Sequence, residues 1–88
     1  MANFDEIWRR IESLEGETFR QIRGGEFTYE IIGTTLKPDR TNQGLPRSQF
    51  EKAFEFMPWE GTKDIQHLRG PSYLYAILMD RRVRKSDD

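Results

Sequence analysis

The sequence predicts a single α+β domain over residues 1–88, with an N-terminal helix, a β-hairpin and two further helices, the last of which is buried. Three observations support this fold class. Apolar residues recur at helical spacing in residues 3–15, a Gly-Gly turn divides an alternating segment at residues 24–25, and an apolar run follows Gly70-Pro71. A chain of 88 residues is long enough for one domain and too short for two.

The first helix is expected over residues 3–15. Its apolar stripe consists of Phe4, Ile7, Trp8, Ile11 and Leu14. Asn3 can cap the first turn, Glu6 has capping-box spacing, and Gly16 suits a left-handed stop. The acid–base pairs expected on its outer face are Asp5–Arg9 and Glu6–Arg10.

Residues 17–32 are expected to form a β-hairpin, because Gly24-Gly25 tolerates the positive φ angles of a tight turn. The apolar residues that alternate along its second strand are Phe27, Tyr29 and Ile31. This alternation buries one face of the ribbon. Two registers stay open: a two-residue turn pairs Ile22 with Phe27, whereas a bulge near Gln21 changes the pairing.

Residues 33–47 are the least regular segment. Residues 34–36 can extend the hairpin by a third strand, while Pro38-Asp39 and residues 42–44 have the composition of turns. A loop of this length in so small a domain is often functional.

The second helix is expected over residues 48–57, with Ser48 and Glu51 as a capping box and Pro58 as its stop. Its buried stripe consists of Phe50, Ala53, Phe54 and Met57. A short helical turn, capped by Thr62, is expected over residues 63–68.

Residues 71–83 begin with Pro71 and contain seven consecutive apolar residues, 73–79, which fit a buried strand or a buried helix. We favour a helix, because Pro71 fits its first position and Leu, Ala and Met outnumber β-branched residues. Its two apolar faces consist of Leu74, Ile77 and Leu78 on one side and Ala76, Met79 and Val83 on the other. Residues 86–88 are expected to fray.

The composition excludes several classes of protein. A net charge of −1 argues against a chain that coats nucleic acid by charge alone. With no cysteine and one histidine, His67, the chain has neither a disulfide framework nor a metal-ligand set. We expect no catalytic residues, no cofactor and no metal. The absence of cysteine, of an apolar leader and of a membrane-length apolar run predicts a cytoplasmic protein.

Local basic clusters nevertheless predict a non-enzymatic module that binds DNA or RNA, most simply as a dimer. The candidate contact residues are Lys37, Arg40, Arg47, Gln49, Lys52, Arg81, Arg82, Arg84 and Lys85. Cations around a helix N-terminus can meet a phosphate backbone, and Gln49 can reach a base edge. Arg20 and Arg23, interleaved with Phe27 and Tyr29, also suggest a surface on which bases stack.

Self-association, or binding of another protein without nucleic acid, is the alternative function. A final helix that is apolar on two sides needs cover on both, and a second copy of the chain can supply it. The residues assigned to this interface are Phe56, Trp59, Ala76, Met79 and Val83. The opposing possibility is that the first helix and the hairpin cover the last element within one chain.

Four phrases of the sequence resemble small uncharacterised prokaryotic proteins, including those carried on mobile integron gene cassettes. They are Gly16-Glu17-Thr18-Phe19, Gly25-Glu26-Phe27-Thr28-Tyr29, the stretch from Arg47 to Ala53, and the stretch from Arg69 to Leu78. The resemblance implies a bacterial source and a mobile element, and it brings no activity or functional residue with it.

Overall fold

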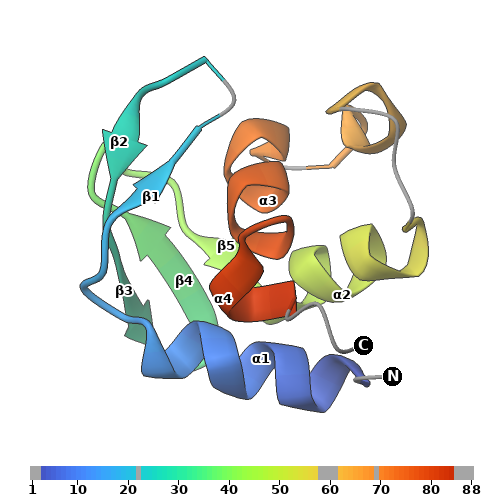
Figure 1. Cartoon of the computed structure of the whole chain (residues 1–88), viewed down its shortest axis with the longest axis horizontal. Helices are drawn as coiled ribbons and strands as arrows, with labels where there is room; N and C mark the ends of the chain where they lie inside the picture. Colours follow the sequence, from blue (N-terminus) through green and yellow to red (C-terminus); the bar gives the residue numbers. More distant parts are fainter. Residues whose placement is uncertain (1–2, 22, 58–61, 69, 85–88) are drawn as a thin grey trace.

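The computed structural model describes residues 3–21, 23–57, 62–68 and 70–84, and its architecture is mixed α+β, as predicted. The helices are α1 (Phe4–Ser13), α2 (Arg47–Glu55), the 3₁₀ turn η1 (Thr62–Ile65), α3 (Pro71–Leu78) and α4 (Arg81–Arg84). The strands are β1 (Phe19–Arg20), β2 (Glu26–Phe27), β3 (Tyr29–Ile32), β4 (Thr35–Pro38) and β5 (Leu45–Pro46). Figure 1 shows the strands on one side, α2 and α3 on the other, and α1 across the base with α4 above it.

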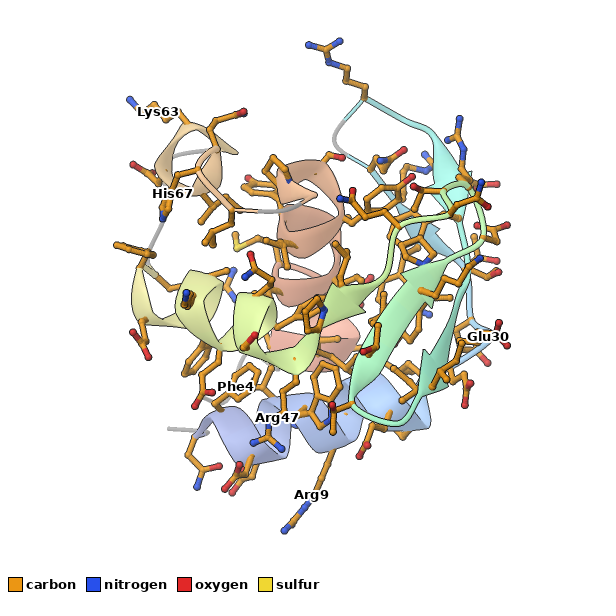
Figure 2. The ribbon with its side chains drawn as sticks, turned by 180° about the vertical axis from the view of Figure 1, so that it is seen from behind. Phe4, Arg9, Glu30, Arg47, Lys63 and His67 are labelled. Carbon is orange, nitrogen blue, oxygen red and sulfur yellow. The ribbon has the colours of Figure 1, made fainter. Side chains whose placement is uncertain are left out.

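The first helix forms where the sequence predicts it. The Asn3 side chain accepts a hydrogen bond from the Glu6 amide at 3.0 Å, and Gly16 takes a positive φ of 87° after the helix. The Glu6–Arg10 pair is present at 3.6 Å, but the Asp5–Arg9 pair was wrongly predicted. Asp5 pairs instead with Arg47, far along the chain, and Arg9 points away from the body of the molecule (Figure 2).

The β1–β2 hairpin contains a bulge at its turn, which is the second of the two registers that the sequence left open. The Gly24 amide donates to the Gln21 carbonyl, the Gln21 amide donates to the Gly25 carbonyl, and Gly24 takes a φ of 95°. A type I turn followed by a left-handed glycine has this pattern. The register therefore places Phe19 opposite Phe27, and the alternative that paired Ile22 with Phe27 is wrong.

The strand predicted at residues 34–36 is present as β4. It pairs with β3 on one side and β5 on the other, so these three strands form an antiparallel sheet separate from the β1–β2 hairpin. Beyond the last β3–β4 pair, Thr28 donates its amide to the Asp39 carboxylate at 3.0 Å and accepts from the Asp39 amide at 2.9 Å. On the outer edge of β3, the Glu15 carboxylate accepts the Ile31 amide at 2.7 Å. This carboxylate occupies a backbone donor that an edge strand would otherwise offer to another chain.

The helix α2 begins one residue earlier than predicted and lacks the predicted capping box. Its N-cap is Pro46, which makes no side-chain cap, so Ser48 does not have the role assigned to it. The Arg47 amide instead donates to the Thr34 carbonyl at 2.8 Å, which ties the start of α2 to the sheet. Phe50 packs against Trp8 with ring centres 5.6 Å apart, which joins α2 to α1.

The final apolar segment is helical, as predicted, but it is not one helix. α3 ends at Leu78, and Asp80 starts the separate turn α4 by accepting the Arg82 amide on its carboxylate at 2.8 Å. This break turns Val83 into the core, where it is fully buried beside α1. None of the described helices is long and apolar enough to cross a bilayer.

Candidate functional site

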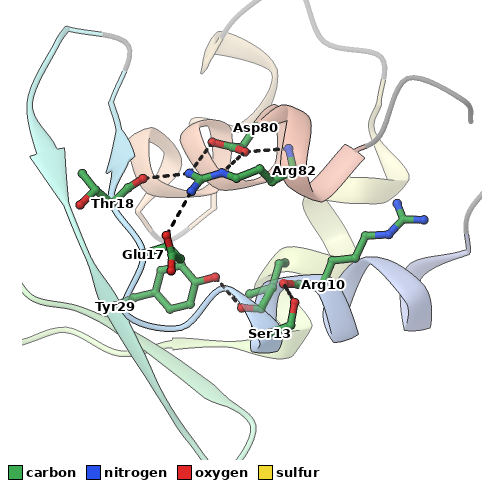
Figure 3. Close-up of polar contacts among 8 residues, drawn as sticks. Arg10, Ser13, Glu17, Thr18, Tyr29, Asp80 and Arg82 are labelled. Carbon is green, nitrogen blue, oxygen red and sulfur yellow. Dashed lines mark hydrogen bonds and ion pairs between the residues drawn. The ribbon is translucent and has the colours of Figure 1, made fainter.

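Arg82, a predicted phosphate contact, binds other residues of the same chain. Its guanidinium holds both carboxylate oxygens of Asp80 at 2.9 and 3.0 Å and donates to the Thr18 carbonyl at 2.8 Å (Figure 3). Partial burial would raise the pKa of Asp80, but the hydrogen bonds and charge of Arg82 outweigh it and hold that pKa below its ordinary value. The same bonds raise the pKa of Arg82. Arg82 therefore fastens α4 to β1.

The rest of α4 is held from the opposite side by Arg10, which donates to the carbonyls of Val83 and Arg84 at 2.9 and 3.1 Å. These are carbonyls of the last turn, which no intrahelical partner satisfies. Arg81 is exposed, and the Arg84 guanidinium lies 3.8 Å from the Met79 sulfur. The predicted contact Lys85 lies outside the described residues.

Arg47 is likewise an internal contact. It forms an ion pair with Asp5, and its guanidinium carbon lies 5.3 Å from the ring centre of Phe4 and 5.9 Å from that of Trp8. Figure 2 shows it beside Phe4, between α2 and α1. Farther along α2, Gln49 is half-buried and Lys52 is exposed. The start of α2 thus offers fewer free cations than the sequence suggested.

The remaining predicted cations, Lys37 and Arg40, lie at the end of the molecule that carries the β1–β2 hairpin. Arg40 donates to the Gln21 side chain of that hairpin at 3.3 Å and is exposed. Lys37 is half-buried on the outward face of β4, opposite Glu30. Sequence-distant segments therefore bring Arg40 beside the hairpin arginines.

We name Arg20, Arg23 and Arg40 the hairpin-end cluster. Arg20 pairs with Glu26 across the hairpin at 3.1 Å, with both side chains largely exposed. Arg23 lies in the exposed turn. Within the described parts of the chain, neither Arg23 nor Arg40 has a carboxylate within ion-pair distance, so Glu26 is the one acidic ion-pair partner that this cluster has there.

The aromatic residues of the hairpin face the core, and the predicted stacking surface is wrong. Phe27 and Tyr29 are 2% and 3% exposed, and both pack against Phe19. The Tyr29 hydroxyl donates to the Ile11 carbonyl at 2.5 Å, and burial raises the pKa of Tyr29 well above its ordinary value. Rings enclosed in this way cannot stack on bases.

Two of the five residues assigned to a self-association interface, Ala76 and Val83, are buried within a single copy. Ala76 is 8% exposed and Val83 is fully buried, while Met79 is half-buried against the same core. Within one copy, the break between α3 and α4 and the packing of α1 against α4 enclose Val83. Phe56 remains 51% exposed, with its ring edge-on to His67 at 5.2 Å. Trp59 lies outside the described residues.

No group of three or more His, Asp or Glu side chains suitable for a metal occurs among the described residues. Sequence reasoning missed two residues of the hairpin end, Gln21 and Gly25, whose contacts depend on tertiary structure. One signal was available for Gly25. Only Gly24 of the two takes a positive φ, so the conformation of the turn does not by itself account for glycine at position 25.

No family model, curated protein or solved structure gives a significant match to the chain. The geometry described above is therefore the basis for a proposed function.

Proposed function

We propose that this chain is a small, non-enzymatic module that binds nucleic acid by contacting phosphates through the hairpin-end cluster. The observation that carries this proposal is the contact of Arg40 with Gln21, which brings Arg40 to the hairpin that carries Arg20 and Arg23. Among the described residues, neither Arg23 nor Arg40 has a carboxylate partner. Arginine presents planar donors that match phosphate oxygens, and phosphate contacts dominate the affinity of such complexes. The hairpin projects past the three-stranded sheet, which favours access to an extended polyanion (Figure 1).

The proposed surface is narrower than the one the sequence suggested. Arg47 and Arg82 are omitted, because each is bound to an aspartate and lies over an aromatic ring. Lys37 is kept as a flanking cation, since it lies on β4 three residues before Arg40. With a net charge of −1 overall, the total charge does not attract a polyanion, so binding needs a local excess of cations such as this one. The lack of cysteine supports a cytoplasmic location.

Fluorescence anisotropy with single- and double-stranded DNA and RNA oligonucleotides tests the proposal. We expect binding that weakens as KCl rises from about 50 to about 200 mM, with a log–log slope set by the number of phosphates contacted. Arg23→Ala and Arg40→Ala should each reduce the magnitude of that slope by roughly 0.7–0.9. Arg9→Ala is the matched control, because Arg9 is exposed on α1 and belongs neither to the hairpin-end cluster nor to the predicted contact residues.

Two outcomes would end the proposal. One is the absence of binding by the wild-type protein to every oligonucleotide at low salt. The other is a salt slope whose magnitude falls in Arg9→Ala while the Arg23 and Arg40 variants retain the wild-type value.

A second candidate function is protein binding through the exposed ring of Phe56, beside half-buried Met57 and Leu68. An aromatic side chain half open to solvent at a helix end is typical of interaction surfaces. Light scattering of the wild-type protein and of Phe56→Ser tests for a second copy as the partner. A monomer in both cases would remove that form of the second candidate.

A further inference from the structure

Gly25 provides space for the Arg40 side chain. Its neighbour Gly24 has a positive φ, whereas Gly25 does not, so the backbone of the turn gives no reason for glycine at this position. A Cβ atom built at Gly25 would lie 2.4 Å from Arg40 Nη1 and 3.0 Å from Gln21 Oε1. Because Gly25 has no side chain, the Arg40 guanidinium has room to lie against the hairpin at this position.

Gln21 holds that guanidinium without neutralising it. Its Oε1 accepts from Arg40 Nη1 at 3.3 Å, and its Nε2 donates to the Ser72 hydroxyl at 3.0 Å, at the start of α3. The Gln21 backbone amide is fixed as well, by the Gly25 carbonyl at 2.7 Å. A carboxylate in this position would cancel the charge of Arg40, whereas the amide oxygen leaves the charge in place.

We propose that Gln21 and Gly25 form a seat that orients the Arg40 guanidinium toward a phosphate group, which makes Gln21 a positioning residue for nucleic-acid binding. This inference rests on the proposed function. One N–H of the guanidinium is used by Gln21, and the other four can serve a ligand. Ordering a long side chain before the ligand arrives removes part of the entropic cost of binding.

The variant Gly25→Ala tests the seat with little disturbance of the fold. The atoms in its way are the ends of two flexible side chains, and the backbone at this position is not in the left-handed region. Gln21→Met is the second variant, because it keeps the length of the side chain and removes both of its hydrogen bonds. Thermal unfolding of each variant confirms that the fold is retained.

The first measurement uses the free protein. ¹⁵N relaxation at Arg40 Nε should report a restricted side chain in the wild type and a mobile one in both variants, while Arg23 Nε serves as an internal reference. A mobile Arg40 in the wild type, equal to Arg23, would show that no seat exists.

The second measurement is a double-mutant cycle on oligonucleotide affinity. Gly25→Ala and Gln21→Met should each weaken binding by about three- to tenfold in the wild type and leave it unchanged in Arg40→Ala, since the residue they position is then absent. An equal loss in the Arg40→Ala background would overturn the positioning role. So would wild-type affinity in both seat variants when Arg40→Ala is weakened.

These outcomes separate the two proposals. If the wild-type protein binds and Arg40→Ala weakens it, the proposed function stands, and only the behaviour of the seat variants decides the present inference. If the wild-type protein binds no oligonucleotide, the proposed function fails first, and the role of Gln21 in binding fails with it.

Discussion

The guanidinium carbon of Arg82 lies 4.4 Å from the centre of the Phe19 ring, so the last helical turn of the described chain rests on its first strand. The same guanidinium holds the carboxylate of Asp80 and the carbonyl of Thr18 (Figure 3). A cation fixed by a ring, a carboxylate and a carbonyl belongs to the fold, because freeing it for a ligand would break all three contacts.

Arg82→Ala should lower the free energy of unfolding by about 1–2 kcal/mol, since it removes a cation–π contact, the two hydrogen bonds to the half-buried Asp80 carboxylate and the hydrogen bond to the Thr18 carbonyl. Urea denaturation measures the change. The matched control is Arg81→Ala, at an exposed neighbouring position, which should stay within about 0.5 kcal/mol of the wild type. Equal stability of the two variants would show that the Arg82 contacts contribute nothing.

Asp80 should make the protein sensitive to acid. Its pKa is lower in the folded chain than in the unfolded chain, so the unfolded chain takes up a proton first as the pH falls. The stabilisation is therefore complete at neutral pH and is lost as the pH falls from about 5 through the folded pKa.

Urea denaturation between about pH 2 and pH 7 measures this loss. In Asp80→Asn the acidic part of the stability profile should be flatter than in the wild type. Glu12→Gln, at an exposed position of α1, should keep the wild-type profile. An Asp80→Asn profile that is parallel to the wild type would contradict the assignment.

Tyr29→Phe should lower the free energy of unfolding by about 1–2 kcal/mol at neutral pH, because it removes the buried hydrogen bond to the Ile11 carbonyl. The pKa of Tyr29 is raised in the folded chain, whereas that of Asp80 is lowered, so Tyr29 makes stability depend on pH at the alkaline end. The folded chain retains the phenol proton more strongly, so stability is lost as the pH rises above about 10. Tyr29→Phe should flatten this alkaline limb, and the half-buried Tyr73→Phe should not.

The elements that the sequence predicted well are those whose signals are local. The first helix has its cap at Asn3, its apolar stripe and its stop at Gly16 within one stretch of chain. Pro71 at the start of the final segment likewise indicated a helix correctly. In each case neighbouring residues decide the backbone conformation, so the pattern is sufficient.

The features that were missed depend on residues far apart in sequence. The pairing of Asp5 with Arg47 takes the place of a local pair with Arg9, and no local rule ranks a partner 42 residues away above one a helical turn away. The break after α3 is set by the Asp80 carboxylate, which turns the chain so that Val83 enters the core. A continuous helix was assumed instead, and its second apolar face then required a second copy.

In the candidate site, too, local features could be predicted and tertiary contacts could not. Basic residues could be counted in the sequence, but which of them stay free depends on tertiary partners. Arg82 and Arg40 look alike in the sequence, yet one faces Asp80 and Phe19 while the other faces an uncharged glutamine. Charge counted along the sequence therefore could not separate the predicted cations that bind an aspartate, Arg47 and Arg82, from those that do not.

The burial of Val83 within one chain leads to a final prediction, on concentration dependence. Val83→Ala should lower the free energy of unfolding by about 1–3 kcal/mol, because it removes two methyl groups from a fully enclosed site. The wild-type midpoint of thermal unfolding, and its shift in the variant, should both be the same across a wide range of protein concentration, since the cover comes from the same chain. A protein stabilised by dimerisation through this residue would instead unfold at higher temperature as its concentration rises. Calorimetry at two concentrations at least tenfold apart decides between the two. A rising wild-type midpoint that Val83→Ala abolishes would contradict this prediction and would support an interface through Val83.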